Sequence, residues 1–388
     1  MLKKLYFKHI HRHIGTIGVY FILYFLLSNV SLMKSISTYL HNGRDISHYI
    51  NGSLIFDFSN SLFLIIVMLS FIEAYRQFHY LHERKEIDFV YSLPVSRNWI
   101  FLSRYISGIL CIIIPFILNM VIGFIIAGVY GASGYVMFHI FLVTLVEFLV
   151  FIFCYTFCVL FMIMTGHSLV YWCSLVLFNV IPLILVQVIQ LTLISKYKEW
   201  KLIAESGDGN PIAYRLLKDI DNFSPAYLVY HFKVAFDSDY DSYGYYDFRN
   251  HFHKLTEFIP LIVVYTLLLF TVIFLLYKMI RTENCGRVLS FSQLQRPLQI
   301  FFTVISGIAI GSLSGYQAEV TYPISYSLNV PFYLLSTLLS IFIIHSMFEI
   351  LFCGEIKKIF RHKWQLFICT GVTFACSIQP YLYYQRYH

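Results

Sequence analysis

Long apolar segments alternate with short polar ones along the whole chain. A stretch of about 20 apolar residues crosses a hydrocarbon layer roughly 30 Å thick as an α-helix. The every-second-residue alternation of a transmembrane barrel is missing. The pattern therefore predicts an all-α, polytopic membrane helical bundle with nine spans: 14–34, 56–75, 103–130, 136–165, 168–195, 258–280, 298–315, 330–352 and 365–384.

The polar segments differ in charge, which indicates the side of the membrane on which they lie. Segments 76–102, 281–297 and 353–364 are rich in Lys and Arg. Positively charged residues concentrate in cytoplasmic loops. We therefore place these loops and the N-terminus in the cytoplasm, and the nearly uncharged 316–329 loop and the slightly acidic 196–257 region outside.

The two ends of the chain carry separate predictions. In residues 1–13, apolar side chains share one helical face and basic side chains lie elsewhere, which predicts an amphipathic helix on the inner leaflet. Nine spans leave the C-terminus outside directly after a helix. Either one apolar segment is re-entrant, or the natural chain continues beyond residue 388.

Composition excludes several classes of function. The chain is 58% hydrophobic and 13% charged, which is unlike a soluble globular domain. Its formal charge of +7 is spread over short loops, so we expect membrane lipid rather than nucleic acid as a partner. The eight cysteines lie in or beside apolar segments and predict neither a disulfide framework nor a metal site.

Motifs for enzyme chemistry are missing from the sequence. It contains no G-x-x-x-x-G-K-[ST] loop for nucleotide phosphates and no H-E-x-x-H or G-x-S-x-G motif. The histidines in "HIHRH" (9–13) and "HFH" (251–253) are two residues apart and point to different sides of a helix. We therefore expect no cofactor, no metal and no catalytic activity in this chain.

The stretch "HERKEIDFVYSLPVSRNW" at 82–99 lies between two apolar segments and carries charges of both signs. Ser92 can cap a helix and Pro94 suits a first helical turn, so we predict two short interfacial helices with a break between them. Charged side chains would pair with a soluble partner, while aromatic residues anchor the element at the lipid boundary. The alternative is an ordinary solvated loop.

The sequence "ERKEIDFVYSLPVSRNWIFLSRYISG" at 83–108 resembles the coupling region of ATP-binding-cassette permeases of the type-two exporter class, particularly large permeases of Gram-positive bacteria. The segment "RTENCGRVLSFSQLQRPLQIFF" at 281–302 resembles the region after the sixth helix in those larger permeases. The resemblance implies a six-span permease core over 14–281, with its coupling region at 76–102 and its external loop at 196–257. About three additional spans at 282–388 depart from the minimal six-helix plan.

The resemblance also implies partners and a contact set. ATP would be bound and hydrolysed by separate ABC ATPase subunits, and a second permease subunit, the same or related, would complete the transporter in the cell membrane. The cargo is left open among peptide, lipid, polysaccharide and drug-like molecules. The implied contact set for the ATPase subunit is Glu83, Arg84, Asp88, Ser92, Leu93, Pro94 and Arg97.

A possible internal repeat accompanies this region. Arg296, Ser306 and Gly307 recur with the same spacing as Arg97, Ser107 and Gly108. Three matches between apolar segments do not establish a repeat.

Glu147, His345 and Glu349 are ionisable residues within predicted spans. A charged, lipid-facing Glu147 would cost on the order of 3 kcal/mol, so we expect it to face the bundle interior or a partner subunit. It is either a conduit residue or a neutral carboxyl bonded to a neighbouring helix. His345 and Glu349 are one helical turn apart, and we expect them to pair with each other as structural groups.

Two other functions compete with the exporter. A sensory or scaffolding membrane protein would bind a ligand with the external 196–257 loop and recruit a signalling partner through its cytoplasmic loops. An intramembrane enzyme using Glu147, His345 or the exterior histidines is a third hypothesis, which no catalytic spacing supports.

Overall fold

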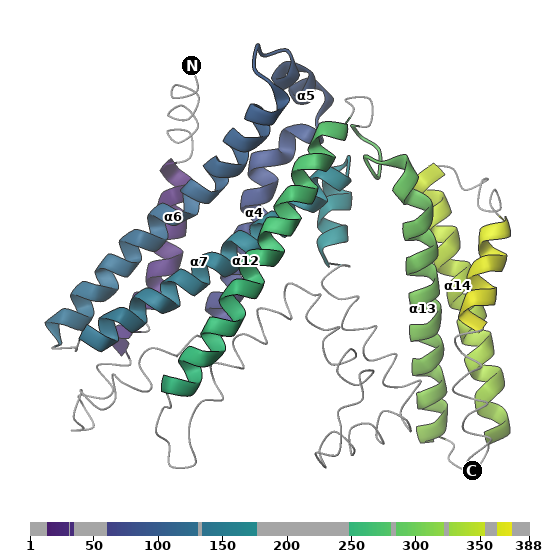
Figure 1. Ribbon diagram of the computed structural model, residues 1–388. Coiled ribbons are helices and arrows are strands. Elements are labelled where there is room, and N and C mark those ends of the chain that lie inside the picture. Colours follow the sequence, from purple (N-terminus) through teal and green to yellow (C-terminus); the bar gives the residue numbers. More distant parts are fainter. Residues whose placement is uncertain are drawn as a thin grey trace. The chain divides into compact units, whose positions relative to one another are not determined.

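The computed structural model describes residues 14–30, 32–34, 60–130, 134–176, 248–280, 285–321, 326–353 and 363–374. Within these ranges the chain is almost entirely helical and forms no β-strand (Figure 1). Five of the described helices are long and apolar enough to cross a membrane: Ile14–Lys34, Arg97–Val129, Ile140–Met164, Ile262–Met279 and Gln293–Gly311. The predicted all-α membrane bundle is therefore confirmed, whereas the arrangement of six plus three spans stays a prediction.

The described helices divide into two compact units. The first unit contains the first span (Ile14–Lys34) with its π-helical turn η1 (Phe25–Asn29), together with α4 (Asn60–Phe78), η2 (His79–Leu81), α5 (Arg84–Tyr91), α6 (Arg97–Val129), α7 (Gly134–Met164) and α12 (Phe248–Met279). The second unit contains α13 (Ser292–Thr321), α14 (Tyr326–Cys353) and a helix at 363–374.

The first unit is built around α7, which packs against α4, α6 and α12. Large aromatic side chains fill the space between these helices. The ring of Phe101 is fully buried, with its centroid 4.9 Å from that of Tyr277 and 5.7 Å from that of Phe78. These three rings come from α6, α12 and α4, so one cluster joins three helices near the polar segment 76–102.

Each unit has a glycine where two helices approach closely. A Cβ atom at Gly108 in α6 would lie 2.6 Å from Cζ of the buried Tyr155 in α7. At Gly307 in α13, a Cβ atom would lie 2.7 Å from Cγ1 of Ile341 in α14. Small residues permit this approach between membrane helices, so both glycines are required by packing.

Some helix ends differ from the predicted boundaries. Helix α12 begins at Phe248, within the segment predicted as external loop, and α13 begins at Ser292 rather than near 298. Hydropathy marks the apolar middle of a helix, whereas backbone hydrogen bonding continues into polar terminal turns. The predicted N-terminal amphipathic helix lies outside the described residues. So do most of the external loop, most of the fifth span and the second half of the last span.

Candidate functional site

Helix α5 has two chemically different faces. Ile87 and Val90 point inward and are buried, as their spacing of three residues on a helix requires. The outward residues are exposed: Arg84, Lys85, Glu86, Asp88 and Phe89. Phe89 is 67% exposed and places an aromatic ring on this outer face. The helix therefore presents charges of both signs around an aromatic side chain.

His82 fixes the start of this element to the end of α7. Its Nε2 lies 3.0 Å from the carbonyl oxygen of Thr165 and 3.2 Å from that of Met162, so Nε2–H donates. The Ser168 hydroxyl lies 3.4 Å from Nδ1 and can donate to it. Burial lowers the pKa of His82 to about 4, which favours the neutral ring that this bonding needs.

The end of α5 is tied to α6 and α12. The guanidinium of Arg97 lies 4.5 Å from the ring centroid of Tyr91, and its Nη1 donates to the carbonyl oxygen of Ile280 at 3.4 Å. Just before α5, the hydroxyls of Tyr80 and Tyr277 are 2.8 Å apart and both side chains are buried. Contacts at both ends therefore connect α5 to three long helices.

A third link runs from the same region to α4. The guanidinium of Arg104 in α6 lies 4.6 Å from the ring centroid of Tyr80. Its Nη1 donates to the carbonyl oxygen of Gln77 at 3.3 Å. A cation over an aromatic ring in a partly desolvated place contributes about 1 kcal/mol, so this contact helps to hold the turn between α4 and α5.

The predicted ATPase contact set lies on this segment. Leu93 is half-buried. The other six members are exposed: Glu83, Arg84, Asp88, Ser92, Pro94 and Arg97. The prediction of two short helices is wrong: α5 is short, but the helix after the break is the 33-residue α6, which begins at Arg97. Ser92 follows α5, where its hydroxyl donates to the carbonyl oxygen of Phe89 at 2.7 Å, and Pro94 lies in the turn before α6 rather than in a helix.

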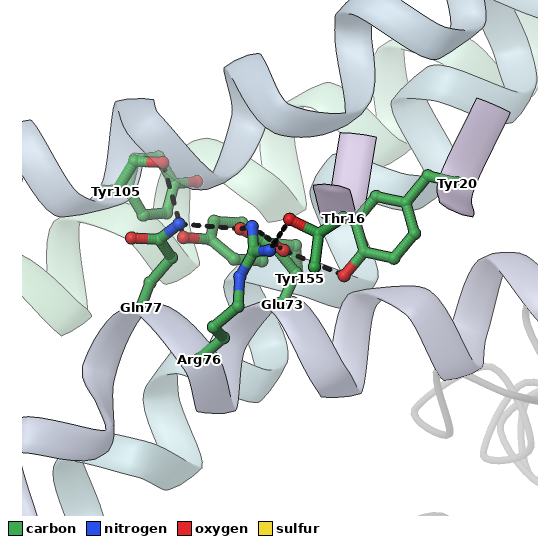
Figure 2. Close-up of polar contacts among 7 residues, drawn as sticks. All are labelled: Thr16, Tyr20, Glu73, Arg76, Gln77, Tyr105 and Tyr155. Carbon is green, nitrogen blue, oxygen red and sulfur yellow. Dashed lines mark hydrogen bonds and ion pairs between the residues drawn. The ribbon is translucent and has the colours of Figure 1, made fainter. Parts of the chain in front are cut away.

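A buried charge network inside the first unit was missed by sequence reasoning (Figure 2). The carboxylate of Glu73 in α4 is fully buried and forms an ion pair with Arg76 at 2.7 Å. Gln77 Nε2 donates to Glu73 Oε1 at 2.7 Å, and the Tyr20 hydroxyl donates to Oε2 at 3.0 Å. Arg76 also donates to the hydroxyl of Thr16. The signal was present in "FIEAYRQF", where two opposite charges three residues apart interrupt an apolar run.

Two more polar bonds hold the first span along its length. The Tyr24 hydroxyl donates to the carboxylate of Glu147 in α7, and Asn29 Nδ2 donates to Asn119 Oδ1 in α6 at 2.8 Å. Tyr20, Tyr24 and Asn29 therefore form one polar face of the first span. Their partners lie on α4, α7 and α6, respectively. The π-helical turn Phe25–Asn29 lies between Tyr24 and Asn29, and its wider winding keeps Asn29 on that face.

Glu147 is therefore buried and bonded to a neighbouring helix, as one of its two interpretations expects. Within the described residues, no Lys, Arg or His side chain forms an ion pair with it. A role as a conduit stays a prediction.

Glu349 lies in the second unit, where the structure adds a partner that the sequence did not indicate. Its carboxylate is fully buried and accepts a hydrogen bond from Arg296 Nη1 at 2.9 Å. The same Nη1 lies 3.0 Å from Gln365 Oε1. This ion pair joins α13, α14 and the helix at 363–374. His345 is buried one turn earlier on α14.

No known protein-family model, curated protein or solved structure matches the chain significantly. The class that the described structure defines is a membrane-embedded helical protein with a short, solvent-facing helix between two of its long helices.

Proposed function

We propose that this chain is the membrane-spanning permease subunit of an ATP-binding-cassette exporter of the type-two class. In this proposal, separate ATPase subunits hydrolyse ATP, and the chain couples that reaction to the export of a peptide, lipid or drug-like cargo. The observation that carries the proposal is helix α5, whose charged outer face is exposed while its inner face is buried and bonded.

The anchoring of α5 supports a mechanical role. His82 connects its start to α7, and Arg97 connects its end to α12 through Ile280. A push on the outer face of a free loop would be absorbed by the loop, whereas a push on α5 acts on these long helices. ATP-driven closure of the ATPase subunits can shift the bundle only if they contact its two states differently. A rigid helix that is bonded to the long helices can transmit such a difference in contact to them.

The outer face also has the composition of a specific docking surface. Glu83 and Asp88 are acidic, Arg84 is basic, and Phe89 supplies an exposed aromatic anchor. Charges of alternating sign set orientation and the rate of encounter, and a central aromatic ring that enters a partner's groove provides binding free energy. The proposed partner is an ABC ATPase subunit on the cytoplasmic side, with a second permease subunit completing the assembly in the cell membrane.

Co-purification tests the proposal directly. Tagged protein solubilised gently from its native membrane should bring with it a chain that has nucleotide-binding motifs. The double charge reversal Glu83→Lys and Asp88→Lys should abolish this association while leaving the amount of folded permease unchanged. Lys363→Glu is the matched control, because Lys363 is an exposed charge in the second unit. Wild-type protein that brings no ATPase with it contradicts the proposal.

A second experiment tests the side of the membrane. A cysteine introduced as Asp88→Cys should react with a membrane-impermeant thiol reagent only after the cells are opened, with wild-type protein as the background. Labelling in sealed cells would place α5 outside, where no ATPase could reach it. If a soluble protein other than an ATPase binds α5 from the cytoplasm, the scaffolding function is favoured instead.

A further inference from the structure

Three potential metal ligands converge where η2 meets α5. They are His79, Glu83 and Glu86, and one ligand atom from each lies within 4.8 Å of the other two. His79 lies in η2, Glu83 has an extended backbone between the two helices, and Glu86 lies in the first turn of α5, so the bend of the chain brings them together. Within the described residues, this is the single group of His, Cys, Asp and Glu side chains that comes together in this way.

His79 lies at ion-pair distance from both carboxylates but forms no short hydrogen bond with either. Nε2 of His79 is 3.5 Å from Glu83 Oε1, and Nδ1 is 4.0 Å from Glu86 Oε2. Charge-assisted hydrogen bonds are about 2.7–2.9 Å long, so neither contact is one. Donor atoms about 2.1 Å from a shared tetrahedral ion lie about 3.4 Å from one another. The separation of His79 Nε2 from Glu83 Oε1 is close to this value, and one ligand atom from each of the three residues lies within 4.8 Å of the other two.

We propose that His79, Glu83 and Glu86 bind one divalent transition-metal ion, with Zn²⁺ as the representative. One imidazole nitrogen and two carboxylate oxygens suit Zn²⁺, and water would complete the tetrahedron. Mg²⁺ prefers an all-oxygen, octahedral shell and is disfavoured by the histidine. The edge of the His79 ring packs against Tyr75 in α4, with ring centroids 4.8 Å apart, so the ring is already oriented.

A bound ion would join η2 to the first turn of α5. The three ligands are partly or fully exposed, so an ion can reach them from solution without opening the bundle. Metal binding is independent of the proposed exporter function. One consequence does rest on that function: Glu83 belongs to both sites, so zinc and the ATPase subunit would compete for its carboxylate.

Isothermal titration of chelator-treated, full-length protein with ZnCl₂ tests the site. Other histidines and cysteines in the chain can bind zinc, so the decisive quantity is the binding step that variants remove. His79→Gln and Glu86→Gln should each lower the zinc affinity of one binding step at least tenfold. Asp88→Asn is the matched control, because Asp88 is an exposed carboxylate of the same helix outside the cluster, and it should bind as wild type does.

A local measurement separates this site from zinc bound elsewhere. Zinc should slow amide hydrogen exchange in residues 79–91 of wild-type protein, and MgCl₂ should not. The slowing should disappear in Glu86→Gln and persist in Asp88→Asn. Equal zinc affinity in all four proteins, or no zinc-dependent protection of this segment, overturns the metal site. ATPase co-purification in the presence of a chelator is unaffected by that outcome, so the two proposals fail separately.

Discussion

Helices α6 and α13 share a local sequence but use it differently. Both contain Ile-Ser-Gly-Ile, at 106–109 and 305–308, and both carry an arginine near their N-terminal end. In each case the glycine lies where a neighbouring helix comes close. Arg97, however, is exposed and contacts the ring of Tyr91, whereas Arg296 pairs with a fully buried carboxylate.

The short shared sequence determines the close helix crossing at the glycine but not the role of the arginine. A glycine in an apolar helix permits a close crossing in either unit because the requirement is local. The role of the arginine depends on distant residues: Glu349 neutralises Arg296, while Arg97 connects α5 with the end of α12. The sequence similarity of α13 to α6 is therefore no reason to propose a docking role for the second unit.

The largest expected difference comes from the two arginines. Arg296→Met removes a cation that is paired with the buried carboxylate of Glu349 and should lower the free energy of unfolding by about 3 kcal/mol. Arg97→Met removes a stacking contact and one long hydrogen bond at an exposed position, and should cost about 1 kcal/mol. Thermal or denaturant unfolding in the same detergent measures both. Equal losses would show that the two arginines are used alike.

Acid should act on the first unit through His82. Its neutral form is favoured in the folded state, so its contribution is fully present above about pH 6.5, the ordinary pKa of histidine, and is lost as the pH falls towards about 4. The full loss is on the order of 3 kcal/mol, since the pKa is shifted by about two and a half units. Melting temperatures across this range should fall more steeply for wild type than for His82→Gln. Parallel curves would rule out His82 as the cause.

The two glycines should differ by a smaller amount. Gly108→Ala drives a methyl group into the rigid ring of Tyr155 and should cost about 2 kcal/mol. Gly307→Ala meets Cγ1 of Ile341 with a smaller overlap and should cost about 1 kcal/mol. The control is Gly18→Ala, where nothing lies within 4 Å of the added atom and stability should hold or rise. A larger loss at Gly307 would reverse the ranking of the two crossings.

The smallest effect on stability is expected on the outer face of α5. Asp88 is exposed, and Asp88→Asn should change the free energy of unfolding by less than about 0.5 kcal/mol. The same substitution should weaken association with the proposed ATPase subunit. A large loss of stability would mean that Asp88 supports the fold rather than a partner.

The sequence predicts the features that depend on local pattern. Apolar runs gave the all-α membrane class, and the mixed charges at 83–88 predicted a cytoplasm-facing element whose exposed charges the structure bears out. Pairings between distant residues could not be predicted, because a single sequence does not show which helices are neighbours. The bonds of Glu73 to Tyr20 and of Glu349 to Arg296 are of this kind.

One part of the missed network was visible in advance. Thr16, Tyr20 and Tyr24 recur every four residues in an apolar span, which marks a polar face turned to the interior. Asn29 breaks that spacing by one residue, and nothing in the sequence indicates the π-helical turn that restores it. The anchoring of His82 was also hidden, because its partners are backbone carbonyl oxygens at the end of another helix.

The turn Phe25–Asn29 has a consequence for how the first span tolerates changes in length. It holds one residue more than a regular turn, so deleting a single residue between Phe25 and Ser28 would let the turn relax into an α-helix with Asn29 still facing Asn119. The turn between Thr16 and Tyr20 holds no extra residue. A deletion there would rotate the hydroxyl of Thr16 or of Tyr20 away from α4. The span thus tolerates a one-residue deletion in its C-terminal half and does not tolerate one in its N-terminal half.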